Sequence, residues 1–206
     1  MSKDVYVVNT SKSPYALLVP EALNNVKIRD TFWKPRLDLL VKSTLPTQYK
    51  FIEETGMLDN FRIASGKKGS YKGFFWFNDS DVYKWIEASA YAIVYQPSDE
   101  LKKMIDNAIK EIINTQQEDG YINTFITINK MKRWKELAWD HELYYAGHLF
   151  QAAVTVKRAL NRTDLYVSAL KFADLLYDTF EAEENKLKLA DGHPEVEMAL
   201  VELYRE

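Results

Sequence analysis

The feature that most constrains the fold is a stripe of apolar residues that follows Ser98. Counted from Leu101, apolar positions recur at +3, +4, +7, +8, +11 and +12: Leu101, Met104, Ile105, Ala108, Ile109, Ile112 and Ile113. An α-helix turns once every 3.6 residues, so these positions lie on one face of a helix. We therefore expect a long amphipathic helix, with Ser98 as its N-cap and Gly120 as the stop that follows it.

Other stretches with the same period predict further helices. Their expected ranges are 31–43 with a restart at Pro46 as far as Glu54, 82–95, a central helix capped by Asp140, 163–180, and a last helix that opens at 192–195. Few segments alternate as strands do. The expected short strands are Val5–Val8, Leu17–Val19 and Tyr121–Ile128. The sequence therefore predicts an all-α fold with minor short strands.

The chain divides into an extended N-terminal segment, residues 1–30, and a helical domain, residues 31–206. Within the domain, Gly56 to Asn78 is expected to be a long loop, because it holds four of the seven glycines. The loop ends in the aromatic run Phe74–Phe77, which either plugs the core or serves a function. Residues 181–189 are expected to form a charged connector.

Composition excludes several classes of function. A net charge of −3 gives no field for nucleic acid or an anionic membrane. The chain has no cysteine, which rules out disulfides, thiolate metal ligands and a thiol nucleophile among its own residues. The N-terminus has no leader-like pattern, and no apolar run is long enough to span a bilayer. We therefore expect a cytoplasmic, non-membrane protein.

The chemistry-bearing residues gather in Trp134 to Val156. This stretch holds two of the three histidines, and His141, Tyr144 and His148 fall on one face at helical spacing. Asp140 suits the N-cap, which would place His141 in the first turn. Two interpretations remain open: a core helix whose histidines bond to buried carbonyls, or one wall of a ligand pocket.

A metal site on this helix is disfavoured by spacing. The segment reads His-Glu with the next histidine seven residues after His141, which is not the H-E-x-x-H pattern of zinc proteases. Seven helical residues rise roughly 10 Å, whereas each zinc ligand lies about 2 Å from its ion. His193 is expected at another helix start, as the N-cap before Pro194.

Several carboxylates also lie in or near these helix starts. Glu142, Glu195 and Glu197 have the chemistry of an acid/base, but first-turn glutamates are also favoured by the helix dipole, and the dipole is the better explanation. Lys84 and Glu87 are expected to form a solvated ion pair. A neutral imidazole at His141 or His193 can donate to or accept from a hydroxyl group of a ligand. Helix pairs wound into an (α/α) toroid would place such turns around one cleft; a solenoid is the rival architecture, disfavoured by the absence of a fixed repeat.

Five ordered blocks resemble the N-terminal part of glycoside hydrolase family 127, the β-L-arabinofuranosidase-like proteins. The blocks are Gly56-Met57-Leu58-Asp59-Asn60-Phe61, Asp79-Ser80-Asp81-Val82-Tyr83-Lys84-Trp85-Ile86-Glu87-Ala88, Gln117-Glu118-Asp119-Gly120-Tyr121, His141-Glu142-Leu143-Tyr144 through Ala146-Gly147-His148, and Gly192-His193-Pro194-Glu195-Val196-Glu197. The resemblance covers nearly the whole chain but only the first part of the longer family sequence.

The resemblance implies about half of an (α/α)6 barrel and a carbohydrate partner. It implies that His141, His193 and Gln48 line the substrate pocket. It places the family's nucleophilic cysteine, acid/base glutamate and zinc ligands further along, with none of those motifs here, so no catalytic residue, metal ligand or cofactor is assigned to this chain. A retaining glycosidase needs both a nucleophile and an acid/base.

Two functional hypotheses follow. The first is the N-terminal part of a glycoside hydrolase acting on L-arabinofuranosides or related sugars, which contributes pocket residues and is inactive alone. The alternative is a non-catalytic helical module derived from that fold, binding a sugar or a protein. Half a barrel leaves apolar flanks open, so we also expect self-association or binding to a complementary C-terminal half.

Overall fold

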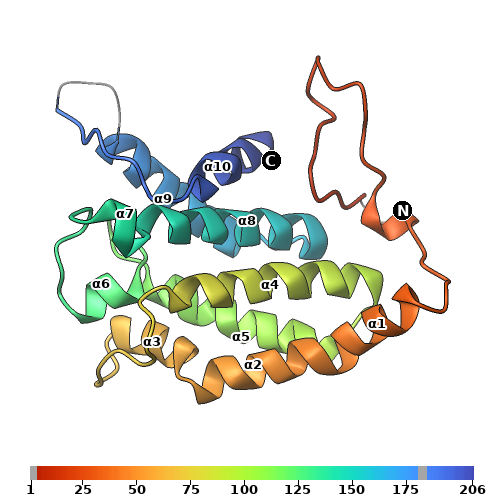
Figure 1. The fold of residues 1–206 in the computed structure, drawn as a ribbon, viewed down its shortest axis with the longest axis horizontal. Coiled ribbons are helices and arrows are strands. Elements are labelled where there is room, and N and C mark those ends of the chain that lie inside the picture. The colour runs from red at the N-terminus through yellow and green to blue at the C-terminus, as the bar shows by residue number, and fades with distance from the viewer. Residues whose placement is uncertain (1–3, 181–184) are drawn as a thin grey trace.

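The computed structural model describes residues 4–180 and 185–206, and helices dominate both ranges (Figure 1). The α-helices are α1 (Trp33–Leu39), α2 (Leu45–Glu54), α3 (Met57–Ala64), α4 (Asn78–Tyr95), α5 (Asp99–Thr115), α6 (Thr124–Ile128), α7 (Leu137–Asp140), α8 (Glu142–Leu160), α9 (Asp164–Thr179) and α10 (Glu195–Arg205). A 3₁₀ turn η1 (Leu23–Asn25) and a π-helical turn η2 (Leu40–Thr44) complete the set. Within the described ranges no strand forms, so the all-α prediction is confirmed and the three predicted strands are wrong.

Helix α5 follows the predicted stripe closely. The Ser98 hydroxyl accepts a hydrogen bond from the Leu101 N–H at 3.3 Å, as an N-cap should. Five members of the stripe are completely buried: Leu101, Ile105, Ala108, Ile109 and Ile112. The helix ends at Thr115, and Gly120 lies beyond it in a turn with a φ of +96°. The amphipathic pattern therefore sets both the helix and the face that it buries.

Helices α4 and α8 lie side by side and run in the same direction, whereas α5 and α9 run back after short connections (Figure 1). Helix α10 packs on the other side of α8. The N-terminal ends of α4 and α8 therefore meet at one end of the molecule, where their unpaired N–H groups and positive dipole ends also lie. This is the end that carries the candidate site.

The contact between α8 and α10 is close because residue 147 is a glycine. A Cβ at Gly147 would lie 2.8 Å from backbone atoms of Glu195 and Val196, which no real side chain tolerates. Helix α10 buries Val196, Ala199 and Leu203 against this contact. The last helix thus forms as predicted, with Ala199 completely buried in the core and Leu200 38% exposed.

Two predicted non-helical regions are helical. The predicted loop from Gly56 to Asn78 begins as helix α3, and only residues 65–77 are irregular. Gly56 has a φ of +82°, so it ends α2 as predicted but leads directly into α3. The predicted strand from Tyr121 contains α6, whose first turn is capped by the Asn123 side chain. The predicted charged connector, Glu181 to Leu189, lies partly outside the described residues.

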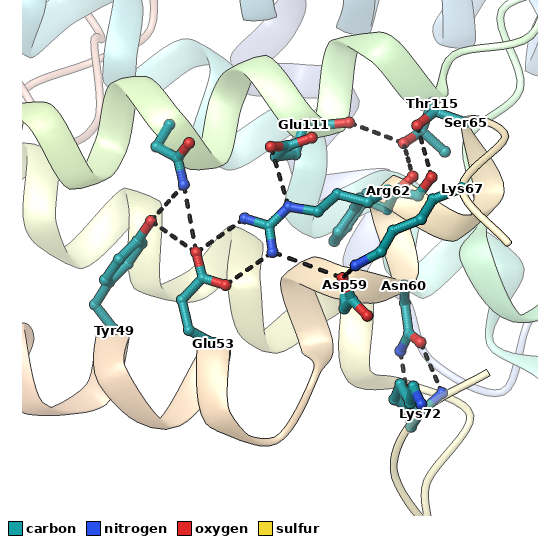
Figure 2. Close-up of polar contacts among 12 residues, drawn as sticks. Tyr49, Glu53, Asp59, Asn60, Arg62, Ser65, Lys67, Lys72, Glu111 and Thr115 are labelled. Atoms are coloured by element: carbon teal, nitrogen blue, oxygen red, sulfur yellow. Dashed lines mark hydrogen bonds and ion pairs between the residues drawn. The ribbon is translucent and has the colours of Figure 1, made fainter. Parts of the chain in front are cut away.

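A network of polar side chains centred on Arg62 joins α2, α3 and α5 (Figure 2). The Arg62 guanidinium donates to both carboxylate oxygens of Glu53 at 2.9 Å and to Glu111 at 3.1 Å. Asn107 and Tyr49 complete the hydrogen bonds around Glu53. These five residues form the Arg62 network. The guanidinium beside Glu53 holds the pKa of that carboxyl below its usual range.

A second buried cation, Arg158 near the end of α8, joins distant segments. Its guanidinium donates to Glu202 on α10 at 2.9 Å, to Glu206 at 2.8 Å and to the Val7 carbonyl at 2.9 Å. The N-terminal segment is therefore attached to the helical domain, although its predicted edge strands do not form.

Candidate functional site

The site begins at the junction of α7 and α8, where His141 separates the two helices. His141 has φ 57° and ψ 28°, the left-handed conformation, so the chain turns sharply at this residue. Asp140 is the last residue of α7 and not the N-cap of α8, which corrects the sequence prediction. His141 itself occupies the N-cap position, where its ring overhangs the helix end.

The carboxylate that caps α8 comes from Asp191, far along the chain. One oxygen of Asp191 accepts the N–H groups of Leu143 and Tyr144 at 2.9 and 3.1 Å. Its other oxygen accepts the His193 N–H at 3.2 Å. Helix α10 starts at Glu195 with Pro194 as its N-cap, so His193 lies one residue earlier than predicted. Asp191 thus links the start of α8 to the turn before α10.

All three histidines of the chain gather around Tyr144, and we refer to these four residues as the histidine cluster. The His141 and His193 rings meet edge to face with centroids 4.8 Å apart. The Tyr144 ring lies 5.1 Å from His193 and 4.5 Å from His148, centroid to centroid. The predicted pocket residues His141 and His193 are therefore brought together, although 52 positions separate them (193 − 141).

The ring nitrogens of the cluster are free of strong protein contacts. Among the described residues, no histidine ring nitrogen makes a hydrogen bond, and Nδ1 of His141 is buried. The nearest polar contact joins His148 Nδ1 to Glu195 at 3.7 Å. The helix is a core helix, as one interpretation had it, but its histidine rings bond to no carbonyl of a described residue.

Burial favours the neutral form of two of these imidazoles, His141 and His148. Burial, followed by the Lys84 charge, lowers the pKa of His148 to about 4. Burial, followed by the neighbouring His193, lowers the pKa of His141. At pH 7 the contact between His148 and Glu195 is consequently not an ion pair, despite its geometry. Neutral rings offer one donor and one acceptor nitrogen each, which suits hydroxyl groups.

An aromatic surface from the irregular segment 65–77 covers one side of the cluster. The Phe77 ring stacks on His141 with centroids 6.1 Å apart and an interplanar angle of 22°. The Trp76 indole donates to the Trp139 carbonyl at 2.9 Å, and the Tyr145 hydroxyl donates to the Trp76 carbonyl. Trp76 and Phe77 of the aromatic run are thus fixed against α7 and α8, whereas Phe74 is exposed. The place of this run at the site was not predicted, although the run itself was visible.

Lys84 on α4 connects the cluster to a neighbouring hollow. Its amine donates to the Tyr144 hydroxyl at 2.7 Å and approaches Asp81 at 3.8 Å, instead of pairing with Glu87 as predicted. Lys84 also lines a hollow of about 440 Å³ together with Gln48, Phe51 and Trp85. The third predicted pocket residue, Gln48, is exposed on α2 and lies in this hollow, not within the cluster.

The first-turn glutamates do not behave alike. Glu142 is 1% exposed, and its carboxylate accepts hydrogen bonds from the Tyr121 hydroxyl and the Trp134 N–H. Burial raises the pKa of Glu142 to about 7. Glu195 remains half-buried beside His148, and Glu197 is exposed. Glu142 therefore differs from the other two glutamates in being held by hydrogen bonds within the core.

No metal centre is evident in the described ranges. Within residues 4–180 and 185–206, no three His, Cys, Asp or Glu side chains lie close enough together to ligate one ion. His141 and His193 are neighbours but find no third ligand there, so the residues do not fit a zinc site. In the same ranges, no helix has the length and apolar character needed to cross a bilayer.

The family model of the β-L-arabinofuranosidase GH127 catalytic domain matches residues 25–206, which include the whole histidine cluster. The chain belongs to this GH127 family. A non-reducing end β-L-arabinofuranosidase of Bifidobacterium longum subsp. longum is 34% identical over 206 aligned positions, covering 88% of this chain and 31% of that relative.

Solved GH127 structures agree with this assignment. A GH127 β-L-arabinofuranosidase from Geobacillus stearothermophilus T6 superposes with a TM-score of 0.84 at 38% identity, over 88% of this chain and 30% of its own. A GH127 β-arabinofuranosidase gives a TM-score of 0.83 at 33% identity, over 89% and 30%. The chain thus spans about a third of the length of these relatives, and its helices fit part of an (α/α) toroid, as predicted.

Proposed function

We propose that this chain forms one wall of the sugar-binding site of a GH127 hydrolase that acts on L-arabinofuranosides. In this proposal His141 and His193 bond to sugar hydroxyls, and Gln48 contacts the substrate from the adjoining hollow. The observation that carries the proposal is the gathering of all three histidines with ring nitrogens that no described residue engages. Buried polar groups are normally satisfied by protein or ligand, so open nitrogens favour a polar ligand.

Neutral histidines also suit this ligand. A furanose presents several hydroxyl groups, each of which can donate and accept, and a neutral imidazole can do both. Phe77 and Trp76 add an apolar ring surface of the kind that packs on the faces of sugars. The N-terminal ends of α4 and α8 disfavour a protonated imidazole at this position.

The reaction itself is assigned to another part of the family fold. This chain has no cysteine, and Glu142 is occupied within the core. We expect no hydrolysis of an aryl β-L-arabinofuranoside by the isolated chain, with or without added zinc. Turnover that scales with the concentration of pure protein would contradict this assignment.

The partner that we propose is a complementary C-terminal half of the toroid. Apolar side chains on α9 and α10 are exposed, among them Val167, Tyr177, Met198 and Tyr204, which is 92% exposed. Without that half, these surfaces should drive self-association. A clean monomer by light scattering at high concentration would argue against both expectations.

Sugar binding can be tested on the chain as it is. With only three histidines, the ring signals in a ¹⁵N-labelled sample are few, and His→Gln variants assign them. Titration with L-arabinose should shift the His141 and His193 ring signals in a saturable way. D-arabinose, the mirror image with identical functional groups, is the matched control and should shift them less. Absence of any saturable shift with L-arabinose would overturn the proposal.

A further inference from the structure

We infer that Asp191 is the positioning residue of this site: its carboxylate fixes the His141 and His193 rings relative to each other. The consequence for sugar binding rests on the proposed function, whereas the positioning itself does not. No other side chain has hydrogen bonds to both histidine-bearing segments in the described ranges.

The two oxygens of Asp191 divide the task. Oδ2 accepts two N–H groups in the first turn of α8, which leaves His141 at the N-cap directly before that turn. Oδ1 accepts the N–H of His193 itself. One rigid carboxylate therefore spans both segments, and its planar geometry fixes their separation.

His141 needs such support because its own conformation is unfavourable. A non-glycine residue in the left-handed region is strained and persists only where its surroundings hold it. The His141 ring meets Phe77 and Tyr144 but makes no hydrogen bond to a described residue. The His141 carbonyl accepts the Tyr145 N–H at 3.0 Å, so its backbone is bonded to the same first turn of α8 that Asp191 caps.

The segment that carries Asp191 is held close to α7. A Cβ at Gly192 would lie 2.5 Å from the Ala138 carbonyl oxygen, so only glycine lets the chain pass there. Gly147 similarly lets the start of α10 rest on α8. The two glycines allow the turn before α10 to approach α7 and α8 closely. The hydrogen bonds of Asp191 then fix the position of this turn along α8.

The experiment uses the full chain and three variants. In the unsubstituted protein, ring protons of His141 and His193 should show a nuclear Overhauser effect, because the ring centroids are 4.8 Å apart. Asp191→Ala should abolish this effect and lower the L-arabinose affinity at least fivefold. Asp191→Asn keeps one acceptor oxygen, so it should weaken the effect and lower the affinity by less.

The matched control is Asp30→Ala. Asp30 also accepts two backbone N–H groups at a helix start, those of the N-cap residue Phe32 and of Trp33 in α1, but it lies outside the histidine cluster. This variant should lose thermal stability as a lost cap does while keeping the ring contact and the affinity.

Each outcome decides the inference. If Asp191→Ala loses stability as Asp30→Ala does but keeps the ring contact, Asp191 is only a helix cap and the inference is wrong. Should Asp191→Ala not fold, an unchanged ring contact in Asp191→Asn would overturn it equally. If the ring contact is lost but the unsubstituted chain never binds L-arabinose, the proposed function fails and the positioning role stands.

Discussion

The Arg62 network and the histidine cluster are both half-buried polar groups between helices, but they treat their polar atoms in opposite ways. In the Arg62 network, three guanidinium nitrogens donate to two carboxylates, and the surrounding amide and phenol groups complete the bonding (Figure 2). In the histidine cluster, no ring nitrogen has a hydrogen bond to a described residue. The polar atoms of the Arg62 network are satisfied within the network, whereas the ring nitrogens of the histidine cluster are not satisfied by described residues.

This difference distinguishes a group of residues that stabilises the fold from one that can bind a ligand. A satisfied network holds helices together and leaves little capacity for a ligand. An open set of donors and acceptors contributes less to folding and retains that capacity. The two clusters should therefore respond differently to substitution: the Arg62 network through stability, the histidine cluster through pH dependence and binding.

The largest effect is expected from Arg62→Met. It leaves Glu53 and Glu111 without their cation, and loss of one partner of a buried pair costs about 3–5 kcal/mol. Because the Arg62 side chain is 26% exposed, we expect about 2–3 kcal/mol less stability in urea unfolding, with L-arabinose affinity unchanged. Arg162→Met is the control, since that arginine is also 26% exposed but pairs with the more exposed Asp106 and Asp164; it should cost less than about 1 kcal/mol.

The next largest effect should come from His148, as a loss of folding stability at acidic pH. Its folded pKa is about 4 and its usual value 6.5, so between these values the unfolded state binds more protons and stability falls as pH falls. The loss of unfolding free energy caused by His148 should reach about 2 kcal/mol at pH 4.5, relative to pH 7. His148→Gln should remove it, measured as the difference between the two proteins in urea unfolding from pH 7 to 4.5.

Two buried carboxyls oppose this trend in the unsubstituted protein. Burial raises the pKa of Asp79 to about 6 and that of Glu142 to about 7, so their stabilisation is present at low pH and lost as pH rises through those values. Only the difference between the variant and the unsubstituted protein therefore isolates His148. Identical pH profiles for both would show that His148 is not held neutral by the fold.

A smaller effect, confined to binding, is expected from His193→Asn. His193 is exposed and Pro194 is the N-cap of α10, so the ring has no structural hydrogen bond to lose. A lost hydrogen bond to a neutral group is worth about 0.5–1.5 kcal/mol, and L-arabinose affinity should fall roughly 2- to 12-fold. Melting temperature should stay the same. A lower melting temperature with unchanged affinity would place His193 among the supporting residues.

The smallest effect is expected from Lys84→Met. Its charge is the second cause of the low pKa of His148, after burial. Removal should raise that pKa above 4 but leave it well below 6.5, as measured by NMR titration of the ring. A full return to 6.5 would mean that charge, not burial, keeps the histidine neutral.

Sequence predicted the parts of the fold that depend on local signals. The α5 stripe and its Ser98 cap needed only neighbours within the helix, and Gly56 supplied the left-handed stop of α2. Helix α6 was missed because its β-branched residues alternate as in a strand. It is held from a distance: the buried Asp79 carboxylate accepts the Thr124 N–H at 2.7 Å and the Thr124 hydroxyl at 2.6 Å.

The sequence predicted which histidines belong to the candidate site, but not which residue holds them in place. His141 and His193 lie at helix starts as predicted, and the structure brings them together, while their role in sugar binding stays a prediction. The cap of α8 was assigned to Asp140, the nearest suitable residue, whereas Asp191 supplies it from 48 positions away. No local pattern distinguishes the two carboxylates, because only the docking of α10 brings Asp191 to α8.

Arg158 has a consequence for the order in which the chain can fold during synthesis. Its bond to the Val7 carbonyl joins residues 151 positions apart, and its partners Glu202 and Glu206 follow it by 44 and 48. Residues 4–9 emerge before α8 and bond locally to Leu23 and Asn24, but they have no hydrogen bond to the described part of the helical domain until Arg158 has emerged. The guanidinium in turn lacks its carboxylates until α10 follows. Nascent chains stalled before α10 should therefore be cut by protease within residues 4–9, and chains released after it should resist. Residues 4–9 would thus be made before α8 and α10 but fixed in place only after them.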